Sequence, residues 1–186
     1  MEEWLISVED LTKATHALRS SMPSAVFAVE NHAGFHREQK YLARWDLGID
    51  DAGSAQIEEH FDQPAMKFLV RSVNHVLTSD EMLEIAQKEL KGIATATHSN
   101  SSESLLEISA IGVSKGETLA KLAQRLDISA ADVITFGDNP NDISMLEWSG
   151  RSYAMATAHP DAQTAAKSIA PECDDDGVAQ ILEELI

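Results

Sequence analysis

From residue 112 to the C-terminus, short apolar runs alternate with segments that have the spacing of amphipathic helices. The helical segments are 115–126, 142–148, 160–167 and 177–185, and the strand-like runs are 133–136, 153–156 and 169–170. Such alternation is typical of crossover units, in which each helix returns the chain to the same edge of a parallel sheet. This part of the chain is therefore predicted to be an α/β domain with a parallel sheet and flanking helices.

Residues 1–108 have a different pattern, in which strands and helices need not alternate. Helices are predicted over 8–19 and 79–90, and strands over 25–29, 67–71, 93–97 and 105–109. Ser79 and Asp80 are the candidate N-caps of the second helix. The polar segment 31–63 is predicted to hold irregular strands and loops. We therefore expect a first, α+β domain at 1–108 and a second domain at 109–186.

The net charge of the chain excludes some classes of binding partner. There are 31 acidic residues against 14 lysines and arginines, which gives a formal net charge of −17 with neutral histidines. A field of this sign repels nucleic acids and anionic membranes, so neither is an expected partner. No apolar run reaches the length of a membrane span, and the acidic start lacks the pattern of a signal peptide. With a single cysteine, Cys173, these features predict a cytoplasmic protein.

The apolar run 133–136 ends at the hexapeptide Gly-Asp-Asn-Pro-Asn-Asp, residues 137–142. In open α/β sheets, ligands bind at the carboxyl ends of strands, and carboxylates gathered there suit Mg²⁺, which takes oxygen ligands. The alternative is a simple turn, because Asn and Asp are common turn residues and Asn141 or Asp142 could cap the next helix. Capping does not explain Asp138, which directly follows the strand.

Ser114 and Glu117 have the spacing of a capping box, which predicts Ser114 as an N-cap and Lys115 as the first helical residue. A lysine is unfavourable at the positive end of a helix dipole. It becomes favourable when an anion binds there, because free backbone N–H groups and an ammonium together hold phosphate oxygens. The alternative is a solvated lysine, tolerated at a small cost.

Four blocks of residues resemble the C-terminal half of haloacid dehalogenase superfamily phosphatases of the Cof type. They are Ser114-Lys115-Gly116, Gly137-Asp138-x-x-Asn141-Asp142, Ala154-Met155-Ala156-Thr157-Ala158 and Asp176-Gly177-Val178-Ala179. The resemblance covers residues 108–186, and residues 1–107 resemble, in length and pattern, the cap domain that this family inserts before its lysine motif. It implies part of a Rossmann-like core plus an α+β cap that sets substrate specificity.

The resemblance also implies an activity. It is the Mg²⁺-dependent hydrolysis of small phosphorylated metabolites, such as sugar or cofactor phosphates, through an aspartyl-phosphate. Lys115 would contact the phosphate and steady the nucleophile, and Asn141 would contact phosphate or metal-bound water. Asp138 and Asp142 would hold the metal, and Asp142 would also orient the catalytic site.

The sequence departs from the family pattern at the nucleophile. These enzymes begin with a strand that ends in Asp-x-Asp-Gly-Thr, whose first Asp attacks phosphorus and whose second is the general acid and base. That motif is not found in the 186 residues, and the acidic run 174–176 opens the last helix, so it is interpreted as a cap. We therefore expect a fragment that is inactive alone and whose exposed sheet edge allows two copies to associate.

Two further hypotheses stay open. The chain could be a noncatalytic descendant that keeps the phosphate and metal site as a regulatory module, or an unrelated α/β binding domain. The sequence contexts of Lys115, Asp138 and Asp142 favour the phosphatase over the unrelated domain. An upstream Asp-x-Asp strand would separate the phosphatase from the regulatory module. The substrate is not indicated, because residues 1–107 hold no diagnostic motif.

Overall fold

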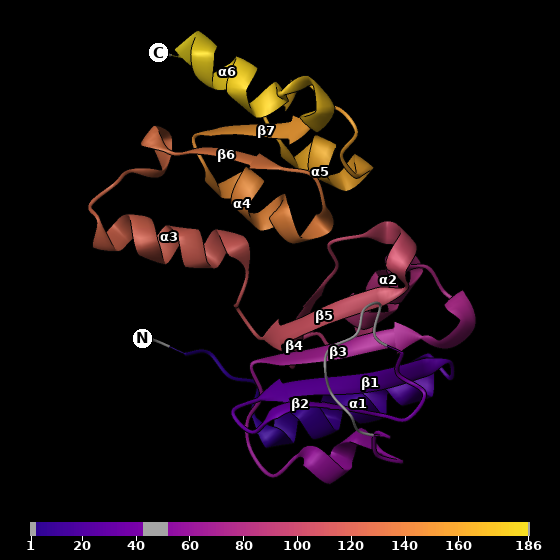
Figure 1. The fold of residues 1–186 in the computed structure, drawn as a ribbon. Coiled ribbons are helices and arrows are strands. Elements are labelled where there is room, and N and C mark those ends of the chain that lie inside the picture. The colour runs from indigo at the N-terminus through magenta and orange to yellow at the C-terminus, as the bar shows by residue number, and fades with distance from the viewer. Residues whose placement is uncertain (1–2, 43–51, 186) are drawn as a thin grey trace. The chain divides into compact units, whose positions relative to one another are not determined.

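The computed structural model describes residues 3–42 and 52–185, and the chain divides into two units, Met1–Val113 and Ser114–Ile186 (Figure 1). The predicted boundary between residues 108 and 109 lies inside strand β5 (Leu105–Ala110), which belongs to the first unit as a whole. None of the described helices is long and apolar enough to cross a membrane.

The first unit is an antiparallel sheet with two helices on one face. Its five strands have the order β2-β1-β3-β5-β4. The strands other than β5 are β1 (Ala25–Asn31), β2 (Gly34–Arg37), β3 (Lys67–Ser72) and β4 (Ala94–Thr97), and the helices are α1 (Val8–Ser21) and α2 (Ser79–Glu89). Each of the predicted strands and helices of this half is confirmed, with ends that differ by one or two residues.

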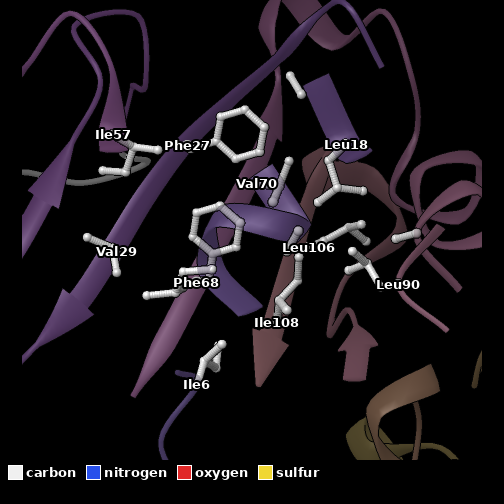
Figure 2. Close-up of a cluster of buried hydrophobic side chains, with 14 of the residues drawn as sticks. Ile6, Leu18, Phe27, Val29, Ile57, Phe68, Val70, Leu90, Leu106 and Ile108 are labelled. Atoms are coloured by element: carbon white, nitrogen blue, oxygen red, sulfur yellow. The ribbon is translucent and has the colours of Figure 1, made fainter. Parts of the chain in front are cut away.

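The core of this unit lies between the sheet and the helices. Alternate residues of β1, β3 and β5 point to one face of the sheet, where they meet apolar residues of α1 and α2. Figure 2 shows this cluster, including Phe27, Val29, Phe68, Val70, Leu106, Ile108, Leu18 and Leu90. The rings of Phe27 and Phe68 stack with their centroids 5.3 Å apart. The core is therefore built from large side chains.

The two predicted N-caps of α2, Ser79 and Asp80, are wrong by one and two residues. Thr78 is the cap: its hydroxyl accepts a hydrogen bond from the Glu81 amide at 3.2 Å, and the Glu81 carboxylate accepts one from the Thr78 amide at 2.8 Å. This is a complete capping box, which the sequence Thr-x-x-Glu could have indicated. The hydroxyl of Ser79 is instead buried and donates to the carbonyl oxygen of Asn100 at 2.8 Å.

Segment 31–63, predicted as irregular, contains β2 and a short 3₁₀ helix (Ile57–His60); residues 43–51 lie outside the described residues. A buried carboxylate organises this segment. Glu38 accepts hydrogen bonds from the backbone amides of Phe27 and Ile57, both at 3.1 Å, and from the guanidinium of Arg19. The ion pair neutralises the buried charge while the two amides tie the segment to β1.

The second unit contains the predicted parallel sheet, in the order β6-β7-β8. Its strands are β6 (Ile134–Gly137), β7 (Arg151–Met155) and β8 (Ser168–Ala170), and its helices are α3 (Lys115–Arg125), α4 (Ile143–Trp148), α5 (Pro160–Ala165) and α6 (Gly177–Leu185). Figure 1 shows α4 and α5 on one side of this sheet and α6 on the other. Among the described strands only β7 pairs with β6, so β6 forms an edge of the sheet.

The core of the second unit is small. Its buried members are Leu146, Met155 and four alanines, Ala154, Ala158, Ala162 and Ala170. Three large apolar side chains in and just after α3 stay exposed: Leu122 at 51%, Leu126 at 59% and Ile128 at 43%. Because burial of apolar area is the main stabilising contribution, the second unit has less to hold it together than the first.

We therefore expect the amide hydrogens of β6 and β7 to exchange with solvent faster than those of β1 and β3 when the native chain is transferred to D₂O. Local opening needs less free energy where fewer apolar contacts must be broken. Hydrogen exchange followed by mass spectrometry, on dilute monomer, measures this directly. Equal protection of both sheets would contradict the expectation.

Candidate active site

The hexapeptide 137–142 forms a tight loop at the carboxyl end of β6. Pro140–Asp142 make one turn of 3₁₀ helix, and α4 follows without a break. The Asp142 side chain folds back over this loop, where its Oδ2 accepts hydrogen bonds from the amides of Asp138 at 3.0 Å and Asn139 at 3.2 Å. The predicted turn is thus present, and its last carboxylate closes it.

Gly137 makes this closure sterically feasible. A Cβ atom at position 137 would lie 2.5 Å from the Cβ of Asp142, far inside normal contact. A side chain at 137 would therefore push Asp142 away from the amides that it accepts from. The sequence shows that the motif begins with a glycine, but only the structure shows that the Asp142 side chain needs the space.

The other oxygen of Asp142 holds Lys115. The Lys115 Nζ lies 2.5 Å from Asp142 Oδ1, with 5% of the Asp142 side chain exposed and 49% of the Lys115 side chain. Lys115 is the first residue of α3, and the predicted N-cap Ser114 is confirmed, because its hydroxyl accepts the Glu117 amide at 3.1 Å. The two motifs, 27 residues apart in sequence, are therefore joined by one ion pair.

A second contact between α3 and α4 was not anticipated from the sequence. The amide of Gly116 donates to the hydroxyl of Ser144 at 3.1 Å. A Cβ atom at position 116 would lie 2.4 Å from the Ser144 carbonyl oxygen, so the two backbones approach closely only because residue 116 is glycine. Ser144 carries no motif of its own, which is why sequence reasoning missed it.

The pKa of Asp142 lies below its ordinary value of 3.8. Burial alone would raise this pKa, because it disfavours the charged form. The hydrogen bond from Lys115, the two backbone amides and the lysine charge outweigh burial and favour the carboxylate. Asp142 is thus charged throughout the physiological pH range.

The other two predicted site residues of this loop are Asp138 and Asn141. The carboxylate of Asp138 is exposed and makes no hydrogen bond or ion pair within residues 3–42 and 52–185, while its backbone oxygen accepts the His159 amide at 2.8 Å. That bond joins the loop after β6 to the loop after β7, as the carboxyl edge of a parallel sheet requires. The Asn141 Oδ1 is buried and has no hydrogen-bond partner in the same described ranges.

The oxygen atoms of this loop fit a hard cation such as Mg²⁺. An exposed carboxylate, a buried carboxylate and an amide oxygen without a partner lie within five consecutive residues, and all are hard oxygen donors of the kind Mg²⁺ takes. Buried polar atoms are rarely left unsatisfied, so the Asn141 oxygen calls for a partner that the described chain does not supply. The acidic residue Asp174, by contrast, lies in a 3₁₀ helix (Cys173–Asp175) that leads into α6.

Replacing Asp142 by alanine is expected to destabilise the second unit by about 1–3 kcal/mol, because the amides of Asp138 and Asn139 lose their acceptor. The matched change Asp138→Ala is expected to stay within about 0.5 kcal/mol, since it removes an exposed carboxylate. Urea denaturation followed by the NMR signals of β6 and β7 gives both values. Equal losses in the two variants would contradict this role of Asp142.

The lowered pKa of Asp142 also predicts a pH dependence. A carboxyl whose pKa is lower in the folded state stabilises the fold fully above its unfolded pKa, and this contribution is lost as pH falls through the folded pKa. The second unit should therefore lose stability as pH falls below 3.8. In Asp142→Asn that part of the pH dependence should vanish, as measured by denaturation between pH 2 and pH 6; an unchanged profile would count against it.

The chain resembles known phosphatases in sequence and in fold. Residues 8–182 match the family of haloacid dehalogenase-like hydrolases. Phosphoglycolate phosphatase of Methanothrix thermoacetophila is 24% identical over 159 residues, which are 86% of this chain and 72% of that protein. The 5-amino-6-(5-phospho-D-ribitylamino)uracil phosphatase YwtE of Bacillus subtilis is 31% identical over 106 residues, which are 57% of this chain and 37% of that protein.

The same relationship holds for solved structures. A sugar phosphatase of haloacid dehalogenase subclass IIB superposes with a TM-score of 0.74 over 98% of this chain and 68% of that chain, at 18% identity, which shows a shared fold. The matches to three Bacillus subtilis phosphatases span 27%, 37% and 37% of the length of those proteins. Since the family match extends over nearly the whole chain, this protein belongs to the haloacid dehalogenase-like hydrolases.

Proposed function

We propose that this chain carries the metal- and phosphate-binding part of a Mg²⁺-dependent phosphatase that acts on small phosphorylated metabolites, such as sugar or cofactor phosphates. The observation that carries the proposal is the Lys115–Asp142 ion pair at the carboxyl end of β6, beside the exposed carboxylate of Asp138. Relatives named as phosphatases of phosphoglycolate and of a ribityl phosphate support this substrate class.

Asp138 and Asp142 are the residues proposed to hold Mg²⁺, with Asn141 contacting phosphate or metal-bound water. When bound, Mg²⁺ would neutralise part of the negative charge of the phosphate. The two carboxylates contribute differently. The Asp138 carboxylate is exposed, whereas both oxygens of Asp142 already accept hydrogen bonds, so Asp142 acts mainly by fixing Lys115 and the backbone of the loop.

Lys115 supplies the positive charge that this acidic chain needs at its site. A chain with a net charge of −17 repels an anionic substrate unless a local cation offsets the field. The Lys115 ammonium has three donors; one engages Asp142, which leaves donors for phosphate oxygens and for a nucleophilic carboxylate. By pairing with Lys115, Asp142 holds the ammonium at the end of the sheet.

We further propose that the nucleophilic aspartate comes from a strand outside these 186 residues, which pairs with the open edge of β6. Exposed Leu122 and Leu126 of the second unit supply apolar surface that such a segment could cover. The carboxylate would attack phosphorus in line, forming an aspartyl-phosphate as the alcohol leaves, and water would then release phosphate and restore the carboxylate. Association of two copies through the same edge remains the competing prediction.

Mg²⁺ is expected to stabilise the second unit weakly, because a site that lacks part of its ligands holds this cation poorly. By mass action, the stabilisation should grow with free Mg²⁺ and become measurable only at high concentration. Thermal unfolding at increasing MgCl₂, with matched ionic strength in NaCl, measures it. The response should be lost in Asp138→Asn.

Asp174→Asn is the matched control, because it removes one acidic charge of the second unit without touching the loop after β6. It should keep the Mg²⁺ response of the unchanged chain. If both variants respond equally, Mg²⁺ only screens the negative charge, and the loop 137–142 is a turn without a metal site.

Phosphatase activity gives the decisive test. The 186-residue chain alone is expected to show no turnover of sugar phosphates above a mock preparation. Joined to an N-terminal segment that carries an Asp-x-Asp-Gly-Thr strand, it should hydrolyse them, and Lys115→Ala or Asp138→Ala should abolish that activity. Turnover by the chain alone that is lost in Asp138→Ala would show that the nucleophile lies within it.

The same experiment tests the regulatory alternative. Binding of Mg²⁺ and phosphate without turnover in the completed protein would favour a noncatalytic module on this scaffold. Turnover unaffected by Asp138→Ala would contradict both proposals, because the activity would then not depend on the loop after β6.

A further inference from the structure

We propose that Ser144 is a positioning residue for Lys115. Its hydroxyl accepts a hydrogen bond from the Gly116 amide at 3.1 Å and so joins the first turn of α3 to the start of α4; we call this bond the clasp. Gly116 directly follows Lys115, and Ser144 lies two residues after Asp142. The bond therefore fixes the backbones on both sides of the Lys115–Asp142 ion pair.

The approach of the two helices at this point is close. Without a Cβ on Gly116, its Cα lies against the backbone of Ser144 and Met145; an added Cβ would lie 2.4 Å from the Ser144 oxygen and 2.9 Å from the Met145 nitrogen. Gly116 is buried, although Lys115 and Glu117 on either side of it are exposed. The contact thus sets the distance between the two helices at this position.

The bond also gives a partner to one amide of the first turn of α3. The first amides of a helix have no partner within the helix. The Ser114 hydroxyl accepts the Glu117 amide, and the Ser144 hydroxyl accepts the Gly116 amide. Ser114 is the N-cap of α3 itself, whereas Ser144 belongs to a different helix, so of these two bonds only the second links the start of α3 to α4.

Fixing the backbone beside Lys115 matters because a lysine side chain does not hold one conformation by itself. A lysine side chain is long and flexible, and the side chain of Lys115 is 49% exposed. Holding it in one rotamer therefore costs conformational entropy. When the backbone is fixed at Gly116, the Lys115 ammonium can reach fewer positions, and a larger share of them lie within hydrogen-bond distance of Asp142 Oδ1. That Lys115 then acts on phosphate rests on the proposed function, whereas the clasp itself does not.

The test removes the hydroxyl with Ser144→Ala in the 186-residue chain. NMR would follow the exchange with water of the Lys115 ammonium hydrogens, identified by their loss in Lys115→Arg, and of the Gly116 amide. Both rates should rise roughly 2- to 10-fold, as expected for the loss of one ordinary hydrogen bond. Amides of β7 should keep their rates.

Two variants separate positioning from general stability. Ser144→Thr keeps the hydroxyl and should restore slow exchange at Lys115. Ser152→Ala removes a comparable bond in the same unit, from the Lys167 amide to the Ser152 hydroxyl at 3.0 Å, and should leave the Lys115 ammonium unchanged. If Ser144→Ala does not fold, Ser144→Cys, of similar size but a weak acceptor, takes its place.

The proposal is overturned if the Lys115 ammonium exchanges at the unchanged rate in Ser144→Ala or Ser144→Cys, or if Ser152→Ala accelerates it equally. Fast exchange in Ser144→Thr would overturn it as well. None of these readouts requires turnover or Mg²⁺, so a failure of the proposed phosphatase activity and a failure of the clasp are seen in separate experiments.

Discussion

One carboxylate, that of Asp142, holds the candidate active site together. Through Oδ2 it closes the loop after β6, and through Oδ1 it binds the ammonium of Lys115 at the start of α3. Because the carboxylate is buried, its charge is tolerable only with these partners, and each partner is in turn fixed by the carboxylate. The backbone of the loop and the position of the Lys115 ammonium therefore both depend on this side chain.

The first unit uses the same physical device for a purely structural purpose. Buried Glu38 accepts two backbone amides and the Arg19 guanidinium, and so fastens the segment after β2 to β1. In both units, a buried acid paired with a cation fixes a stretch of backbone that does not form the regular hydrogen bonds of a sheet. The difference lies in the surroundings of the cation. Lys115 lies at the carboxyl end of β6 beside the exposed carboxylate of Asp138, whereas Arg19 pairs with Glu38 within the first unit.

The two units also differ in how their sheets are supported. In the first, stacked aromatic and branched side chains fill the space between an antiparallel sheet and two helices. In the second, alanines dominate a small core under a parallel sheet, and Leu122 of α3 and Leu126 just after it are exposed. The open edge of β6 and this exposed apolar surface are the features that the proposed upstream strand would cover.

The family resemblance implied that Lys115 lies near the loop after β6. The sequence by itself determined the alternation of strands and helices, the parallel sheet, the Ser114 cap and the placing of Asp138, Asn141 and Asp142 at the end of β6. These follow from local periodicity, turn chemistry and motif order, which are properties of neighbouring residues. Only the tertiary structure decided that Asp142 binds Lys115, that Gly116 and Gly137 provide the space, and that Ser144 clasps α3. All of these contacts except that of Gly137 with Asp142 join residues far apart in the chain, and their geometry depends on how closely two backbones pack, which no local pattern records.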